Sequence, residues 1–281
     1  MTLVPALGLL AVVCFWRWRV VRRAERVPVA DKLLRPAGES LRRRIEALDD
    51  KLTDTFLLGI FAPLGAIAAV FFALALSPPL TRLVVAFVSG VAAFAFVTRR
   101  MLAQLRELRN CRLGFHGERA VAEEINQLMR DGCRVFHDVP MEPYGNIDHV
   151  IVAPSGVYAV ETKTRRKRKA PPGKKDHEVV FDGKALEFPH GADTHGLEQA
   201  RQQADRLRAM LTKAVGEPVG TMAILTLPGW FVMSRVNGPL KVVNPKGIRH
   251  VVTANQPASL TPQLIERISY QLDQRCRDVE L

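Results

Sequence analysis

The sequence predicts an α/β domain with a mixed sheet flanked by helices, preceded by transmembrane helices. Two observations support this fold class. Two nearly charge-free runs, residues 55–76 and 80–97, are each long enough to cross a bilayer as a helix. After these runs in the sequence, the hydrophobic periodicity indicates a helix, three strands, a helix and a further strand, an order typical of a sheet packed between helices.

The composition points to an anionic partner. The 281-residue chain has a formal charge of +12 although 48% of its residues are apolar. We therefore expect apolar and basic residues to lie in separate segments of the chain. A basic excess favours nucleic acid or anionic lipid as a partner. The four cysteines are scattered without a CxxC pair, so we expect reduced thiols and neither a zinc site nor a disulfide framework.

The two long apolar runs predict an antiparallel transmembrane hairpin. Residues 55–76 carry no charge, and residues 80–97 carry only Arg82, which lies near the interface end and can reach the headgroups. The Ser-Pro-Pro turn between the runs is too short for any other arrangement. A shorter apolar run, residues 3–16, is either an uncleaved anchor with its N-terminus outside or a helix lying on the membrane surface.

The distribution of arginine predicts the orientation of these spans. Residues 17–54 and 99–112 are rich in arginine, whereas the turn between the two spans, residues 77–81, has none. Positive flanks stay in the cytoplasm. We therefore expect a multi-pass protein of the cell (inner) membrane, with two or three spans and everything from Arg99 onward in the cytoplasm.

The segment before the hairpin predicts an amphipathic helix. Ser40 is a candidate N-cap, and four apolar residues follow at helical spacing: Leu41, Ile45, Leu48 and Leu52. Such a stripe is most often a packing face. The alternative is that it mediates homo-oligomerisation.

The remaining elements follow from periodicity and turn residues. Residues 99–112 predict a helix continuing the second span, and residues 118–130 a separate amphipathic helix. A hairpin with Asp-Gly at its turn is expected over residues 178–188. The other expected elements are strands at 134–139, 221–227, 240–243 and 250–253, and helices at 193–215 and 261–277.

The most informative stretch is residues 145–163, which predicts a β-hairpin turning at Pro-Ser-Gly. Asp148 lies early in the first strand and Glu161 late in the second, so the hairpin places them across from each other. Glu161 and Lys163 share a face because strand side chains alternate. Two carboxylates and an ammonium at the end of apolar strands are costly unless they bind something.

Oxygen ligands for Mg²⁺ beside a lysine are what metal-assisted phosphodiester hydrolysis requires. The alternative is a surface ion pair between Glu161 and Lys163, which would contribute little. His149 is expected on the opposite face of its strand from Asp148, packed or hydrogen-bonded inside. His116 is expected in a loop before the helix at 118–130. We favour neither histidine as a general base.

Three separated blocks of this sequence resemble the nuclease-related domain (NERD). They are Gly-Phe-His-Gly-Glu-Arg at 114–119, Ile-Asp-His-Val-Ile-Val at 147–152 and Gly-Val-Tyr-Ala-Val-Glu-Thr-Lys at 156–163. That family is placed among the PD-(D/E)xK restriction-endonuclease-like folds, and the resemblance covers roughly residues 113–230. Ile147 stands where the superfamily name has proline, which leaves the ligands unaffected.

The resemblance implies a set of site residues. Asp148 and Glu161 would bind Mg²⁺ or Mn²⁺ together with the backbone carbonyl of Thr162, and Lys163 would position or activate water or offset charge on the phosphate. Glu118 would be the acid that a helix adds to the site; the alternative is an acid favoured by a helix N-terminus. Gln199 would face the cleft from the second helix, although a plain exposed glutamine is an equal alternative.

A basic loop follows the hairpin directly. Its charges are Arg165, Arg166, Lys167, Arg168, Lys169, Lys174 and Lys175, around a Pro-Pro-Gly break. It is expected to contact nucleic-acid phosphates. Binding to anionic lipid headgroups is an equal alternative.

These patterns predict six segments: a membrane anchor at 1–20, a basic segment at 21–54, the transmembrane hairpin at 55–98, a linker helix at 99–112, the nuclease-like domain at 113–230 and C-terminal elements at 231–281. The expected function is a metal-dependent nuclease acting on cytoplasmic DNA, with RNA not excluded. The alternatives are a catalytically weak or silent module that tethers DNA at the membrane, and a domain that only supports a membrane assembly.

Overall fold

The computed structural model describes residues 32–253 and 259–279. Residues 34–277 form one compact unit, and the expected anchor at 3–16 lies outside the described residues. The helices are α2 (Glu39–Ala73), α3 (Pro79–Asn126), the 3-10 helix η1 (Gln127–Asp131), α4 (His195–Val215), α5 (Gly247–Thr253) and α6 (Pro262–Cys276).

The strands belong to three sheets. The central sheet has five strands, β2 (Arg134–Pro140), β3 (Asn146–Ala153), β4 (Gly156–Thr162), β8 (Thr221–Thr226) and β10 (Leu240–Val243). A second sheet has four strands, β5 (Glu178–Phe181), β6 (Leu186–Phe188), β7 (Gly191–Asp193) and β9 (Phe231–Ser234). The short strands β1 (Leu33–Leu34) and β11 (Arg277–Val279) pair as the third.

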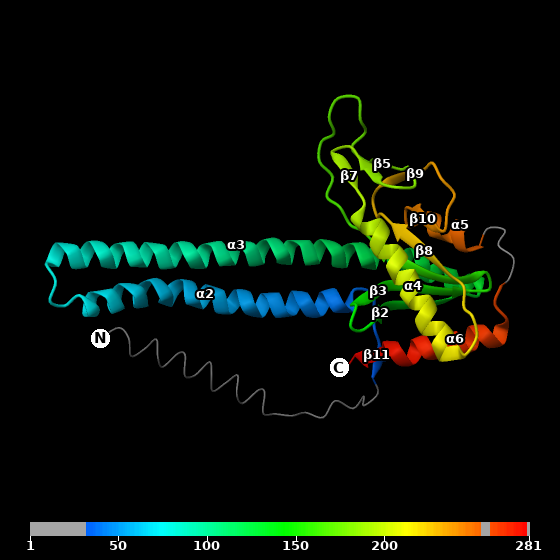
Figure 1. The fold of residues 1–281 in the computed structure, drawn as a ribbon, viewed down its shortest axis with the longest axis horizontal. Helices are drawn as coiled ribbons and strands as arrows, with labels where there is room; N and C mark the ends of the chain where they lie inside the picture. The colour runs from blue at the N-terminus through cyan, green and yellow to red at the C-terminus, as the bar shows by residue number, and fades with distance from the viewer. Residues whose placement is uncertain (1–31, 254–258, 280–281) are drawn as a thin grey trace. The chain divides into compact units, whose positions relative to one another are not determined.

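The central sheet is mixed, as predicted. Its strand order is β10-β8-β4-β3-β2, with β2, β3 and β4 antiparallel and β4, β8 and β10 parallel. The connection between the parallel strands β4 and β8 contains α4, which packs on the sheet (Figure 1). This is the arrangement of an α/β domain with an antiparallel hairpin at one side of a parallel sheet.

The two faces of the central sheet are buried by different helices. One core joins alternate strand residues such as Val150 and Ala159 to Leu207 of α4 and Ile268 of α6. The other core joins the intervening strand residues to α3, η1 and α5. Because side chains alternate along a strand, one hairpin supplies both cores.

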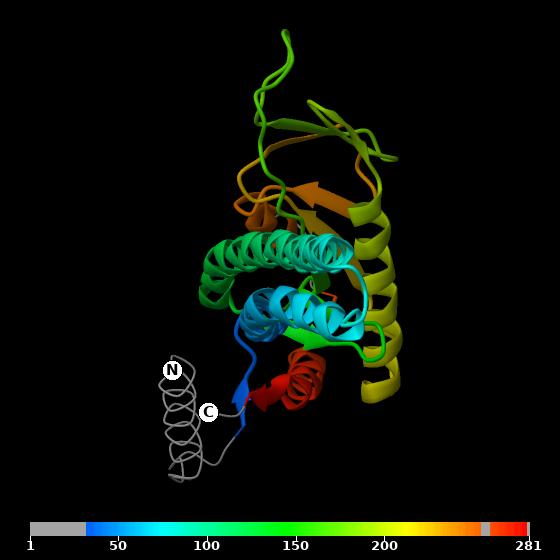
Figure 2. The ribbon, with the colours of Figure 1, turned by 90° about the vertical axis from the view of Figure 1, so that its left-hand side faces the viewer.

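The apolar runs lie in two long helices that run side by side (Figures 1 and 2). Both α2 and α3 are long and apolar enough to cross a membrane. In α2 the most apolar stretch has no buried residues, and large side chains such as Phe61 and Phe72 are exposed along it. This pattern of exposed large hydrophobic residues is typical of a surface that faces lipid.

The stripe at the start of α2 is a packing face. Leu48 is buried against Leu108 and Cys111 of α3, with Leu41, Ile45 and Leu52 packed around them. The prediction of a packing stripe is therefore confirmed.

Two predicted helix boundaries were wrong. The linker helix and the helix expected at 118–130 are one continuous α3, so His116 lies inside a helix and not in a loop. Glycine at 114 and 117 costs helix propensity, but tertiary packing overrides it because neighbouring residues approach these positions closely. Ser40 is not an N-cap: α2 is capped by Gly38, and the Ser40 hydroxyl donates to Asp138 Oδ2 at 2.7 Å.

The C-terminal region contains a further correction. The residues expected as a strand at 250–253 form the end of α5, because Asn244 Oδ1 accepts a hydrogen bond from Gly247 N at 2.9 Å where that helix starts. The helix expected from Asp193 begins at His195, and Asp193 ends β7. The hairpin at 178–188 is confirmed as β5 and β6.

Candidate active site

Three carboxylates from three elements meet in one cleft. His149 of β3 pairs with Val160 of β4, so the next residues along these antiparallel strands, Asp148 and Glu161, lie side by side. Glu118 of α3 lines the same cleft, which has a volume of about 770 Å³. The convergence of Asp148 and Glu161 predicted from the hairpin is present.

Lysine and glutamine complete a polar chain at the cleft. Lys163 Nζ lies 2.6 Å from Glu161 Oε1 and donates to Gln199 Oε1 at 2.7 Å. Glu161 is only 2% exposed, so this is not the surface ion pair considered from the sequence. A glycine in the first turn of α4, Gly196, permits the arrangement, since a Cβ there would lie 3.0 Å from Lys163 Cγ.

Burial shifts the protonation of two of the carboxylates. Burial and, secondarily, the negative charges of Asp138 and Glu161 raise the pKa of Glu118 to about 8. Burial, followed by the charges of Glu161 and Glu118, raises the pKa of Asp148 well above its usual range. The Thr162 backbone N–H, which donates to Asp148 Oδ2 at 2.7 Å, opposes this shift. The ionised forms of these two carboxylates are therefore disfavoured in the cleft, and a bound cation would stabilise them.

Three buried oxygen atoms without hydrogen-bond partners lie at this cleft. Glu118 Oε2 and Glu161 Oε2 are buried without a hydrogen-bond donor, as is the Thr162 hydroxyl. Buried polar atoms are normally paired, and exceptions often mark a site for an ion or substrate. Hard oxygen atoms of this kind suit Mg²⁺ or Mn²⁺.

The protein ligand set is small. Among the described residues, no group of three or more His, Cys, Asp and Glu side chains is placed to hold a metal ion. Asp148, Glu161 and the Thr162 carbonyl would leave the remaining positions to water and substrate phosphate. This is how Mg²⁺ is commonly bound in phosphate-processing sites.

The two histidines of the central sheet form a buried pair outside the cleft. His149 Nδ1 lies 2.9 Å from His137 Nδ1, and His137 Nε2 lies 3.0 Å from Asn126 Oδ1. Burial lowers the pKa of His137 to about 4 and that of His149 well below its usual value. His149 is an interior residue, as predicted.

The basic loop is held at its base. The Trp230 indole donates to the Arg165 carbonyl at 3.3 Å, and the Arg165 guanidinium lies 4.2 Å from the centre of the Phe188 ring. Three of the seven predicted basic residues, Arg165, Arg166 and Arg168, line the cleft. Lys174 and Lys175 instead contact Pro189 and Glu178, away from it.

Several cleft residues were not anticipated from the sequence. They include Asn146 at the start of β3, and Ser40 and Arg44 near the start of α2. Asn146 stands two residues before Asp148 and therefore shares its face of the strand, a periodicity that could have identified it. The contribution of α2 depends on contacts across about a hundred residues, and no local pattern reveals it.

Comparison with known protein families agrees with this geometry. Residues 113–228 match the model of the family described as Nuclease-related domain. We call the matched residues, 113–228, the nuclease-related domain after this similarity. The match contains Glu118, Asp148, Glu161, Lys163 and Gln199, and its limits agree with the predicted extent of the resemblance. No curated protein and no solved structure matches the chain significantly.

Proposed function

We propose that this chain is a membrane-anchored, divalent-metal-dependent nuclease that hydrolyses phosphodiester bonds of cytoplasmic DNA, with RNA as a second substrate class. The observation that carries the proposal is the meeting of Asp148, Glu161 and Lys163 in an open cleft of the nuclease-related domain. Three carboxylates are buried together, and two of them, Glu118 and Glu161, have an oxygen atom without a hydrogen-bond partner. Such an arrangement is unfavourable for folding unless the carboxylates bind an ion.

Asp148, Glu161 and the Thr162 carbonyl are the proposed metal ligands. When bound, Mg²⁺ or Mn²⁺ would supply Lewis-acid stabilisation of charge on the phosphate and lower the pKa of a bound water. The Thr162 N–H fixes the Asp148 carboxylate through the 2.7 Å hydrogen bond, so one of its oxygen atoms is already oriented. The ligands are thus held by the backbone of the hairpin.

Lys163 and Gln199 orient one another. Because Gln199 Oε1 accepts from Lys163 Nζ at 2.7 Å, the ammonium is held beside Glu161. There it can hydrogen-bond the attacking water or offset negative charge that develops on the phosphate. Glu118, whose pKa is raised to about 8, can hold or accept a proton near neutral pH.

The cationic rim supports nucleic acid as substrate. Arg165, Arg166 and Arg168 line the cleft beside the carboxylates and would bind the phosphate backbone. The arginine-rich flanks of the apolar segments favour a cytoplasmic location for this cleft, within a protein of the cell (inner) membrane.

The test is a cleavage assay on the full chain in lipid nanodiscs. Wild type is expected to cleave labelled DNA with Mg²⁺ or Mn²⁺ and not with EDTA, and closed circular DNA distinguishes internal cutting from attack at ends. Glu161→Gln preserves shape and is expected to abolish cleavage while retaining binding in EDTA. Lys213→Gln, on α4 away from the cleft, is the control.

Two outcomes would contradict the proposal. Equal inactivity of wild type and Glu161→Gln on DNA and RNA, with salt-sensitive binding intact, would favour the DNA-tethering alternative. Binding only to anionic vesicles, undiminished by competitor DNA, would favour the basic loop as a lipid-binding segment.

A further inference from the structure

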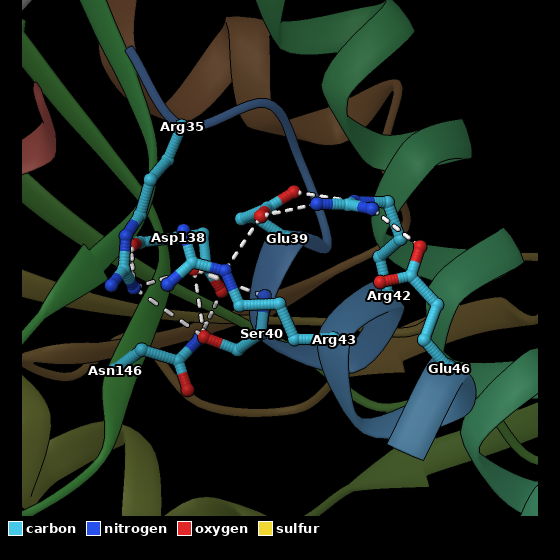
Figure 3. A network of polar contacts seen from close by, with 8 residues as sticks. All are labelled: Arg35, Glu39, Ser40, Arg42, Arg43, Glu46, Asp138 and Asn146. Carbon is cyan, nitrogen blue, oxygen red and sulfur yellow. Dashed lines mark hydrogen bonds and ion pairs between the residues drawn. The ribbon is translucent and has the colours of Figure 1, made fainter. Parts of the chain in front are cut away.

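The start of α2 is fixed to the nuclease-related domain through one buried carboxylate. Asp138 of β2 is fully buried, and its Oδ2 accepts from Arg35 Nη1 at 2.8 Å, from the Ser40 hydroxyl at 2.7 Å and from the Ser40 backbone N–H at 3.2 Å (Figure 3). Its Oδ1 accepts from Asn146 Nδ2 at 2.8 Å. The segment that leads into the apolar hairpin therefore shares a hydrogen-bond network with the strand that carries Asp148.

Packing fixes the same turn of α2 against α3. Gly38 adopts φ +78°, and a Cβ there would lie 2.7 Å from a ring carbon of Phe115. Leu41 approaches α3 so closely that a Cβ at Gly114 would lie 3.1 Å from its Cδ1. The first turns of α2 are consequently held in a defined position beside α3 and Glu118.

This part of α2 forms part of the cleft wall. Ser40, Leu41 and Arg44 line the cleft that contains Asp148 and Glu161. Arg44 is the cation among them. Its guanidinium lies 2.5 Å from Glu107 Oε1 on α3, but both side chains are well exposed, at 63% and 42%. An ion pair this exposed is weak, so a phosphate can displace it.

A second arginine reaches the same face of α3. Arg166 of the basic loop donates to Asn110 Oδ1 at 2.9 Å and to the Arg109 carbonyl at 3.0 Å. Glu107 and Asn110 are three residues apart and therefore neighbours on the helix surface. Arg44 and Arg166 are thus brought to adjacent positions by α3, one from the start of α2 and one from the nuclease-related domain.

We propose that Arg44 binds a backbone phosphate of the nucleic acid in this cleft, beside Arg166, and that α2 is part of the substrate-binding surface. This inference rests on the proposed nuclease function and extends it beyond residues 113–228. Glu107 competes with the phosphate for Arg44 in this arrangement. Removing the charge of Arg44 should therefore weaken binding of nucleic acid, and removing the charge of Glu107 should strengthen it.

The experiment measures binding of a fluorescein-labelled single-stranded oligonucleotide and its duplex by the full chain in nanodiscs, in EDTA, across salt concentrations. For Arg44→Gln we expect binding about three- to ten-fold weaker at ~0.1 M salt, with a salt slope reduced by about one. For Glu107→Gln we expect binding that is tighter by about two-fold or more, a change that misfolding cannot produce. Arg44→Lys should retain most of the affinity.

The matched control is Arg249→Gln. Arg249 is also 63% exposed and also paired with one acid, Asp131, but it lies outside the cleft. It is expected to bind as wild type does. Wild-type affinity and salt slope in both Arg44→Gln and Glu107→Gln would overturn the inference while leaving the nuclease proposal intact. Failure of the wild-type chain to bind or cleave any nucleic acid would remove both.

Discussion

Replacing Gly117 by alanine tests the close contact that sets the position of α3 at the cleft. A Cβ at Gly117 would lie 1.9 Å from Thr164 Oγ1, 3.0 Å from Thr164 Cβ and 3.2 Å from Thr164 Cγ2. Rotation of Thr164 can move its hydroxyl but not its Cβ, so α3 or the chain after β4 must shift. Gly117 precedes Glu118, and Thr164 follows Lys163, so the shift separates two proposed site residues.

The magnitudes predict a larger effect on activity than on stability. Glycine to alanine inside a helix gains about 1 kcal/mol from propensity, whereas overpacking costs about 1–3 kcal/mol, so the net destabilisation is about 0–2 kcal/mol. A misplacement near 1 Å at a catalytic site can cost about 100-fold in rate. We therefore expect Gly117→Ala to reduce kcat/KM by about 10- to 100-fold while the chain remains folded.

The assay is metal-dependent cleavage by the full chain in nanodiscs, together with chemical denaturation. Gly65→Ala on α2 is the control, because a Cβ there meets nothing within 4 Å, and its activity should not change. Adding Thr164→Ala to Gly117→Ala removes two of the three close contacts and should restore part of the activity. Full activity in Gly117→Ala, or no recovery in the double variant, would refute this account of the contact.

Three further predictions concern charge. Glu118 has a pKa near 4.5 in the unfolded chain and near 8 in the folded chain, so the free energy of unfolding falls as pH rises through this window. Glu118→Gln should therefore stabilise the metal-free chain by about 2–4 kcal/mol at pH 8.5 and hardly at pH 4.5. Denaturation in EDTA measures this difference. His137 has a pKa near 4 in the folded chain and 6.5 in the unfolded chain, so stability is lost as pH falls from 6.5 to 4. The difference in free energy of unfolding between wild type and His137→Gln should change by about 2–3 kcal/mol over that range. A difference that stays constant with pH would contradict this prediction. Finally, Arg168→Gln should reduce the salt slope of DNA binding by about one, whereas Lys175→Gln should not, because Arg168 lines the cleft and Lys175 does not. Equal slopes in the two variants would argue against binding of the DNA phosphate backbone in the cleft.

The core of the candidate site was predictable because its geometry is local. Asp148 and Glu161 are joined by a short hairpin whose turn residues are evident, so the register follows from counting along two strands. Alternation then places Lys163 beside Glu161. Glu118 and Gln199 were inferred from family resemblance, and the structure places both at the same cleft.

The parts that could not be predicted depend on distant contacts. Nothing near Asp138 in the sequence indicates that Ser40, 98 residues away, donates to it, or that the residue adopts a positive φ of 48°. The helix α5 was misread as a strand because Val251 and Val252 favour strands, while side-chain capping at Asn244 and burial of Ile248 and Val252 favour the helix. Short segments of this kind are decided by tertiary packing.

The network around Asp138 also makes the start of α2 a structural part of the nuclease-related domain. A fragment beginning at residue 113 loses Arg35 and both Ser40 donors, which leaves a fully buried carboxylate with only Asn146 among the described donors. Removing the partner of a buried charge costs about 3–5 kcal/mol, so this fragment should be much less stable than the domain in the full chain.

Asp138→Asn should then have opposite effects on the stability of the full chain and of the fragment. It should destabilise the full chain, where it breaks the pairing with Arg35, and stabilise the fragment, where it removes an unpaired charge; asparagine also tolerates the positive φ. Denaturation of the four proteins measures this reversal, and a change of the same sign in both contexts would show that the contacts of α2 with Asp138 do not support the domain.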